Sequence, residues 1–171
     1  MSLFKKLFGK KEIENPTKLW PLANPVELTF NLQGLSFCGV RFGTDFEFCK
    51  TFGKTDSFKG ENGFFTLTYP DSGFEVEFNE GEVDLVKVIF GEDKFNPDGC
   101  QFASLTLSDG IKIDKETSEA DLISVFGELN ERDEDETEIV VNFIQNDLNI
   151  EAELNLQGKL KNIVFFIMES K

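Results

Sequence analysis

The chain of 171 residues carries 32 acidic and 17 basic side chains, a formal net charge of −15, and no histidine. That charge disfavours contact with nucleic-acid phosphates, and the lack of histidine excludes a Ser-His-Asp or Cys-His nucleophile. The three cysteines have no C-x-x-C spacing, so we expect no zinc site, no cofactor and no enzyme activity. The 20 phenylalanines instead predict a core packed with aromatic rings.

The N-terminal segment, residues 1–22, begins with a basic amphipathic pattern in an otherwise acidic protein. At helical spacing its apolar side chains share one face and lysines surround them: Leu3, Phe4, Lys5, Lys6, Leu7 and Phe8. The uninterrupted apolar run of a signal peptide is missing. Two interpretations stay open: a peripheral tether to an anionic membrane surface, or a short helix that packs on the acidic body.

Irregular β segments follow this first stretch. Trp20 lies between two Asn-Pro turns and is expected either to fill a gap in the core or to cover a sheet edge. Apolar and polar side chains alternate along residues 27–32, which predicts a strand. Residues 35–42 predict a second β-rich segment that Gly39 interrupts.

The cysteines indicate the compartment. Cys38, Cys49 and Cys100 form an odd set without framework spacing, so we expect reduced, buried thiols. A reducing compartment is the cytoplasm, and the inner membrane face is the alternative location if residues 1–11 act as a tether.

A short helix is predicted over Thr44–Phe52. Thr44 and Glu47 have the spacing of a capping box, and Gly53 is the residue expected to end the helix with a positive φ. Residues 54–63 then predict a polar loop.

Three strands with alternating faces follow at Phe65–Tyr69, Phe74–Asn79 and Glu82–Phe90. Short turns at residues 70–73 and at Gly81 separate them, which predicts an antiparallel meander. One face carries mainly Phe and Val toward a core. The opposite face carries charged and polar side chains, together with Leu85 and Ile89 on the third strand.

The second half repeats this order. A turn at residues 91–99 and a hairpin at residues 102–113 lead to a helix over Ser118–Phe126, with Ser118 and Asp121 as its capping box and Gly127 as its end. The charged run of residues 128–138 predicts a solvated loop, a docking site for a basic partner or a loose cation site. Strands are then expected at Ile139–Phe143, Ile150–Asn155 and Lys159–Ile167.

The repeat determines the predicted architecture. The step from Phe52-Gly53 to Phe126-Gly127 has the same length as the step from Tyr69 to Phe143. We therefore predict an α+β fold of two tandem pseudo-symmetric modules, each a short helix plus an antiparallel β-meander. The predicted division is residues 1–22 as an N-terminal segment and linker, 23–98 as the first module and 99–171 as the second.

The helix, the Phe-Gly step and the meander together resemble the small α/β repeat of the BamE-like outer-membrane assembly lipoproteins and of the β-lactamase-inhibitor-protein family. The Pro that follows the Gly in those families is absent after both Phe52-Gly53 and Phe126-Gly127, and lipoprotein anchoring is not carried over. The resemblance implies a non-enzymatic module that binds other proteins, in the inhibitor family through an exposed sheet face.

The outward strand positions and the charged run predict a partner-binding site. Its candidates are Glu75, Glu77, Lys87, Glu151, Glu153, Val164, Phe166, Asp133, Glu134 and Asp135. Carboxylates steer a basic partner and apolar neighbours supply buried area. For the glutamates alone, a solvated surface is the simpler interpretation.

The leading hypothesis is a bacterial, cytoplasmic protein-binding module, most concretely an inhibitor or immunity-type protein that neutralises a basic partner. One alternative is a peripheral membrane adaptor tethered by the basic N-terminus, and another is an acidic mimic of nucleic acid. An enzyme is the least supported, because the i, i+2 spacing of Glu75/Glu77 and Glu151/Glu153 occurs on any strand.

Overall fold

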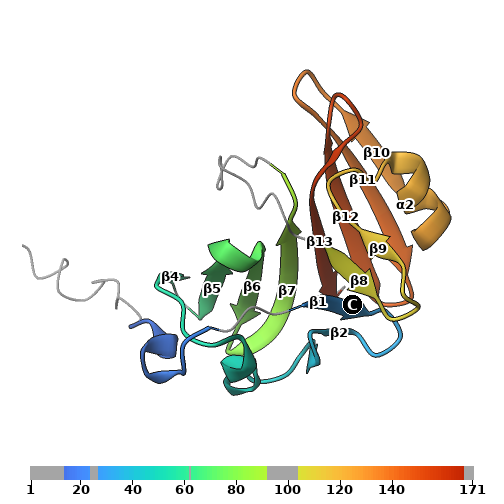
Figure 1. Cartoon of the computed structure of the whole chain (residues 1–171). Coiled ribbons are helices and arrows are strands. Elements are labelled where there is room, and N and C mark those ends of the chain that lie inside the picture. Colours follow the sequence, from blue (N-terminus) through green and yellow to red (C-terminus); the bar gives the residue numbers. More distant parts are fainter. Residues whose placement is uncertain (1–13, 24–26, 62, 92–103, 168–171) are drawn as a thin grey trace, which may run out of the picture.

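The computed structural model describes residues 14–23, 27–61, 63–91 and 104–167. Two β-sheets make up most of this part of the chain (Figure 1). The large sheet has eight strands in the order β10-β11-β12-β13-β7-β6-β5-β4, and the small sheet has five in the order β3-β2-β1-β8-β9.

The large sheet is antiparallel throughout. Its strands are β4 (Ser57–Glu61), β5 (Phe64–Tyr69), β6 (Phe74–Asn79), β7 (Glu82–Ile89), β10 (Glu131–Glu134), β11 (Glu138–Gln145), β12 (Leu148–Asn155) and β13 (Leu160–Ile167). Strands β4–β7 form one meander and β10–β13 another. The two join where β13 pairs with β7, with Val86 opposite Phe165 and Val88 opposite Ile163.

The small sheet assembles short strands that lie far apart in the sequence. Its members are β1 (Leu28–Asn31), β2 (Ser36–Phe37), β3 (Val40–Arg41), β8 (Leu105–Leu107) and β9 (Lys112–Ile113). Strands β1 and β8 pair in parallel, with Phe30 opposite Leu107. The predicted hairpin is confirmed, because Leu105 pairs with Ile113 across a turn that contains Gly110 at φ 87°.

The helical segments are short. They are the 3-10 helices η1 (Pro16–Leu19), η2 (Phe46–Phe52) and η3 (Pro70–Ser72) and the α-helix α2 (Glu119–Phe126). The capping box of α2 is confirmed, because Ser118 and Asp121 bond each other's backbone N–H groups. At η2 the predicted cap is wrong: Asp45 accepts from the N–H of Glu47, while the Thr44 hydroxyl donates to the carbonyl of Arg41.

The core lies between the large sheet and a layer made of the small sheet, η2 and α2. Phe30 of β1 stacks on Phe165 of β13 with ring centroids 4.0 Å apart, and in Figure 1 β1 and β8 lie beside β13. The ring centroids of Phe52 on η2 and Phe74 on β6 lie 5.2 Å apart. The ring of Phe126 on α2 lies 5.5 Å from the ring of β11 Phe143. Along β5–β7 and β11–β13, one face of the large sheet is therefore buried.

Trp20 fills a gap at one end of this core. Its side chain is 7% exposed and its ring stacks on Phe46 with centroids 6.0 Å apart. Phe46 in turn meets Phe65 edge to face at 5.8 Å. The predicted role of Trp20 as a core residue is confirmed.

The predicted α+β fold of two modules, each a helix plus a meander, is wrong. The described chain is mainly β-sheet, and it forms a five-stranded and an eight-stranded sheet. The segment expected to be the first helix is a seven-residue 3-10 helix, too short to form an α-helical layer. The meanders do not stand as separate units, because pairing between β7 and β13 makes them one sheet.

Two predicted loops contain strands. Residues 54–63 hold β4, and residues 128–138 hold β10. Each is an edge strand of the large sheet and forms backbone hydrogen bonds with only one neighbouring strand. Neither has a buried face, so its sequence shows no alternation of apolar and polar residues. The predicted boundaries after residues 22 and 98 stay predictions, and residues 92–99 of the expected turn lie outside the described residues.

Candidate protein-binding face

The strand register arranges the outward side chains of the large sheet in rows. Partners opposite each other on neighbouring strands point to the same side of a sheet. Across β5, β6, β7, β13, β12 and β11 one row reads Thr68, Glu75, Lys87, Val164, Glu151 and Asn142. The row beside it reads Thr66, Glu77, Leu85, Phe166, Asn149 and Ile144. We call this side of the sheet the open face.

A third row runs along the end of the open face where β7 leaves the sheet. It contains Ile89, Asn162, Glu153, Val140 and Asp133. Ile89 and Asn162 are 3% and 1% exposed, whereas Leu85, Val164 and Phe166 remain half-buried. The accessible part of the open face therefore consists of the first two rows together with Glu153, Val140 and Asp133 of the third.

The centre of the open face is apolar. Leu85 on β7 and Val164 and Phe166 on β13 lie at the seam between the two meanders, with Phe166 directly opposite Leu85. Glutamates flank them on both sides, two on β6 and two on β12. A half-buried apolar strip inside a charged rim has the composition of a protein-binding surface.

The carboxylates of the open face lie close enough to repel one another. Loss of hydration raises the pKa of Glu77, and the neighbouring Glu75 and Asp84 raise it further, whereas Lys87 lowers it. Loss of hydration also raises the pKa of Glu151, and Glu153 adds to the effect. A positive group that approached this face would relieve the repulsion.

One glutamate is held by its neighbours. Glu153 accepts a hydrogen bond of 2.6 Å from Asn162 Nδ2, and Lys161 Nζ lies 3.5 Å from its carboxylate. Lys161 also donates to Glu138 at 2.6 Å. A register shift between Glu153 and Leu154 lets Lys161 reach this side of the sheet. Glu153 is therefore tied into the sheet more firmly than the other three glutamates.

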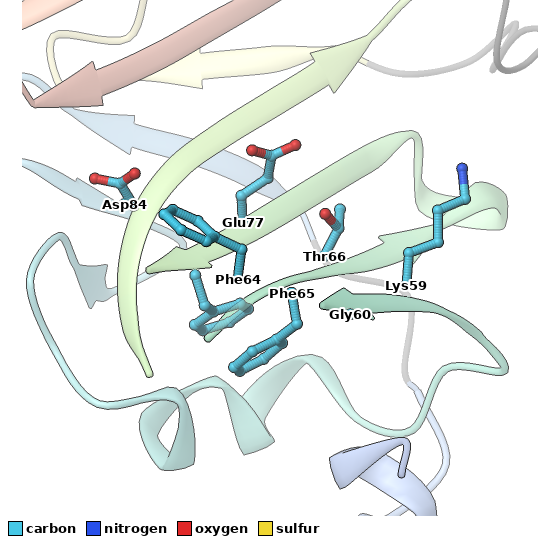
Figure 2. A pocket seen from close by; sticks show the side chains of 8 residues that line it. Lys59, Gly60, Phe64, Phe65, Thr66, Glu77 and Asp84 are labelled. Atoms are coloured by element: carbon cyan, nitrogen blue, oxygen red, sulfur yellow. The ribbon is translucent and has the colours of Figure 1, made fainter. Parts of the chain in front are cut away.

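A hollow of about 310 Å³ lies at the β4 end of the open face (Figure 2). It is lined by Lys59, Gly60, Phe64, Phe65, Thr66, Glu77, Phe78 and Asp84. Figure 2 shows the carboxylates of Glu77 and Asp84 above the ring of Phe64, with Lys59 extending away from them. Phe64 is 58% exposed, so an apolar surface lies beside two acids and can receive a side chain of a partner.

The structure brings seven predicted residues together. Glu75, Glu77, Lys87, Glu151, Glu153, Val164 and Phe166 all lie on the open face. Asp133 lies at its β10 edge, opposite Val140. The next residue, Glu134, points to the other side and pairs with Arg132 at 2.8 Å.

Asp135 is a turn residue. Its carboxylate accepts hydrogen bonds from the Thr137 hydroxyl and from the N–H groups of Thr137 and Glu138, and these bonds lower its pKa. The membrane-contact candidates Leu3, Phe4, Lys5, Lys6, Leu7 and Phe8 lie outside the described residues.

Sequence reasoning predicted Glu77 at the hollow but missed Lys59 and Phe64. Lys59 could not be assigned to a strand face because β4 shows no alternation of apolar and polar residues. Phe64 was left out because the predicted strand began one residue later. Leu85 could have been selected, since it alternates with Val86 on β7 and shares a face with Lys87.

Metal ligands and thiols are the remaining candidates for chemistry among the described residues. They contain no group of three or more His, Cys, Asp or Glu side chains arranged to hold a metal ion. Cys49 is fully buried and Cys38 half-buried, and both are free thiols. Burial raises the pKa of Cys49 to about 12, which makes it a poor nucleophile.

Comparisons with known proteins identified no relative of this chain. No family model, curated protein or solved structure matches the chain. The resemblance to the BamE-like and β-lactamase-inhibitor-protein families stays a prediction. Within the described ranges the structure has no helix with the length and apolar character needed to cross a bilayer.

Proposed function

We propose that this protein is a non-enzymatic binding protein that captures a basic partner protein on the open face. The observation that carries the proposal is the apolar seam of Leu85, Val164 and Phe166 between two pairs of glutamates on one continuous sheet. The most concrete form of the proposal is an inhibitor or immunity-type protein that neutralises a basic toxin or enzyme.

The charge of the face supports a basic partner. Glu77 and Glu151 are held where hydration is reduced and other carboxylates are near, and both effects raise their pKa values. A lysine or arginine from a partner would stabilise the ionised carboxylates. The net charge of −15 would also accelerate encounter with a positive protein.

The apolar seam favours a protein over a mimicry role. A mimic of nucleic acid needs carboxylates in an extended array without a hydrophobic interruption, because it imitates a row of phosphates. Here Phe166 and Leu85 lie in the middle of the array. Side chains of this kind supply the buried area of protein–protein contacts.

The test compares two charge reversals of equal size. In the first variant Glu75, Glu77 and Glu151 are changed to Lys; Glu153 is left unchanged because it bonds Asn162. In the control variant Glu128, Glu136 and Asp147, which are exposed and lie off the open face, are changed to Lys. Immobilised wild-type protein identifies the partner in a cell extract, and titration calorimetry with the purified partner measures the Kd of each protein.

We expect the first variant to bind at least about tenfold more weakly and the control to change Kd by less than about threefold. Phe166→Ser should weaken binding by a similar factor, since it removes apolar contact at the seam. Equal losses in the first variant and the control would mean that net charge alone drives binding. Unchanged binding by the first variant and by Phe166→Ser would exclude the open face.

A further inference from the structure

A register shift occurs in each meander of the large sheet, and the two shifts lie at corresponding places. Between β6 and β7 the shift follows Glu77 and leaves Asp84 as an extra residue on β7. Between β12 and β13 the shift follows Glu153 and leaves Lys161 as an extra residue on β13. An extra residue of this kind is a β-bulge, which turns a side chain in a new direction. The bulges bring Asp84 near Glu77 and Lys161 near Glu153.

In the second meander the space beside the bulge is filled by the lysine of the bulge itself. Lys161 Nζ donates to a carboxylate oxygen of Glu138 at 2.6 Å and lies 3.5 Å from Glu153 Oε2. All three side chains are half-buried. This part of the sheet therefore holds one cation between two carboxylates.

The first meander has different side chains at the corresponding positions. Phe64 corresponds to Glu138, because each pairs with the asparagine two residues after the glutamate on the next strand. Asp84 corresponds to Lys161. The hollow of about 310 Å³ lies here, and Figure 2 shows the carboxylates of Glu77 and Asp84 beside the ring of Phe64. The first meander thus presents an open space lined by acids where the second is closed by a lysine.

The charges at the hollow favour a cation. Loss of hydration raises the pKa of Glu77, and the carboxylates of Glu75 and Asp84 raise it further, whereas Lys87 lowers it. Lys59 also lines the hollow, and in Figure 2 its ammonium group extends away from the two acids. A positive group between Glu77 and Asp84 would relieve their repulsion.

The ring of Phe64 distinguishes between the cations that a protein partner can supply. It is 58% exposed. A guanidinium group is planar, so it can stack on an aromatic ring while its N–H groups bond to carboxylates, whereas an ammonium group is compact and strongly hydrated. The hollow is therefore better suited to arginine than to lysine.

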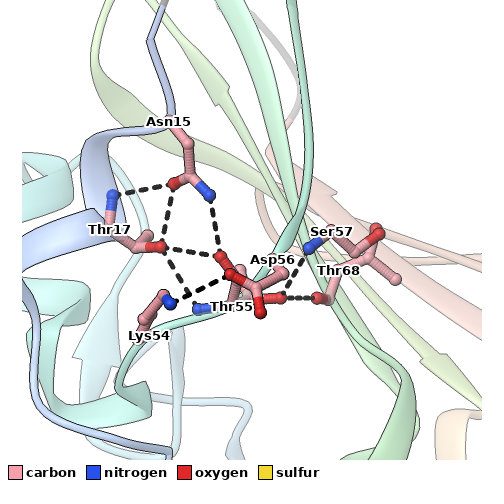
Figure 3. A network of polar contacts seen from close by, with 7 residues as sticks. All are labelled: Asn15, Thr17, Lys54, Thr55, Asp56, Ser57 and Thr68. Carbon is pink, nitrogen blue, oxygen red and sulfur yellow. Dashed lines mark hydrogen bonds and ion pairs between the residues drawn. The ribbon is translucent and has the colours of Figure 1, made fainter.

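Strand β4, which forms one wall of the hollow, is held in place at its start. The hydroxyl of Thr55 donates to the carbonyl of Thr68 on β5 and accepts from the N–H of Ser57 at 3.1 Å (Figure 3). Asn15 Nδ2 also donates to the carbonyl of Thr55 at 2.8 Å. A wall that is fixed before binding loses less conformational entropy when the hollow is occupied.

We propose that this hollow receives an arginine side chain of the basic partner. The guanidinium group bonds to the carboxylates of Glu77 and Asp84 and lies against the ring of Phe64, at the place that corresponds to Lys161 in the second meander. Arginines in such pockets often supply a large share of binding energy. The inference rests on the proposed function, because the arginine belongs to the partner that the open face captures.

The experiment is a titration of the full chain with N-acetyl-arginine methylamide, followed by ¹H–¹⁵N NMR. The comparison probes are the lysine and citrulline analogues, since citrulline has the shape of arginine without its charge. We expect the arginine probe to shift the amide signals of Thr66, Glu77 and Asp84 with a Kd on the order of 1 mM. The signals of Glu138 and Lys161 should not shift, because a cation already lies there.

Three variants identify the contacts. Asp84→Lys gives the first meander the residue found at the second bulge, and should weaken binding of the arginine probe by about tenfold or more. Asp147→Lys makes the same charge change at an exposed position off the open face, and should weaken it by less than about twofold. Phe64→Ser should remove the preference for arginine over lysine. Circular dichroism establishes that each variant is folded.

The inference is overturned if the arginine probe causes no saturable shift at the hollow, or if the lysine or citrulline probe binds equally well. It is also overturned if Asp84→Lys and Asp147→Lys weaken binding equally.

Calorimetry with the purified partner separates this inference from the proposed function. Asp84→Lys should raise the Kd for the partner by about tenfold. An unchanged Kd overturns the arginine contact, whereas weaker binding by Phe166→Ser in the same series still supports capture on the open face. Unchanged binding by both variants overturns both proposals.

Discussion

Glu77 and Glu151 lower the free energy of unfolding when their carboxyl groups are ionised in the folded protein. Both carboxyl groups have a raised pKa because hydration is reduced and other carboxylates are near. The folded protein therefore binds more protons than the unfolded chain at pH values between the unfolded and folded pKa of each group. Their contribution to the free energy of unfolding is consequently lost as the pH rises through this interval.

Replacing both residues with Gln should therefore stabilise the protein at pH 7. We expect the free energy of unfolding of Glu77→Gln/Glu151→Gln to exceed that of wild type by about a few tenths of a kcal/mol, since solvent screens partly exposed groups. The difference should disappear below about pH 4, where the glutamates are largely protonated in both states.

Urea unfolding at several pH values measures this difference. Glu128→Gln, in an exposed position off the open face, controls for the loss of a negative charge. A double variant that is less stable than wild type at pH 7 would contradict the direction of both pKa shifts.

Gly53 ends η2 and Gly127 ends α2, and the two glycines differ in how closely other residues approach them. Gly53 ends η2 at φ 80° and Gly127 ends α2 at φ 89°. A Cβ atom on Gly53 would lie 2.4 Å from Ala23 Cα, whereas a Cβ on Gly127 would meet nothing within 4 Å. The carbonyl of Gly53 also accepts a hydrogen bond of 2.9 Å from the hydroxyl of Tyr69.

We therefore expect Gly53→Ala to be much more destabilising than Gly127→Ala. Gly127→Ala should cost about 1 kcal/mol, the strain of a positive φ in a residue with a side chain. Gly53→Ala adds a collision with the backbone near Ala23, and should cost at least about twice as much. Thermal and urea unfolding compare the two variants, and equal costs would show that the contact between Gly53 and the segment 21–23 is not tight.

At the scale of the whole molecule, stacked rings join the two sheets. Phe30 of the small sheet and Phe165 of the large sheet are both buried, with ring centroids 4.0 Å apart. Because the small sheet is itself built from both halves of the chain through the β1–β8 pair, neither half can complete its core alone. We expect the described structure to unfold as one cooperative unit.

A double-mutant cycle on the two rings tests this expectation. Phe30→Ala and Phe165→Ala should each reduce the free energy of unfolding by about 3–5 kcal/mol, through lost burial and a residual cavity. Their coupling should be about 0.5–1.5 kcal/mol, as found for contacting aromatic pairs. Trp20 fluorescence and far-ultraviolet circular dichroism should give the same transition. Separate transitions, or additive effects, would contradict the joint core.

The local sequence was sufficient for features with a local physical cause. Alternation with period two predicted β5, β6, β7, β11, β12 and β13 and which side chains point outward, because each of these strands has one buried face. The spacing of Ser118 and Asp121 predicted the cap of α2, since a capping box uses only neighbouring atoms. Seven of the candidate binding residues consequently lie together on one face.

Only the tertiary structure decided how those strands combine. The edge strands β4 and β10 contain mostly exposed or half-buried side chains, so no apolar pattern marks them. The parallel pair of β1 with β8 and the junction of β7 with β13 connect residues far apart in the chain, and backbone hydrogen bonds of that kind leave no signal in either local sequence. The sequence alone thus determined what each strand shows to solvent, whereas long-range pairing made one continuous acidic face of two meanders.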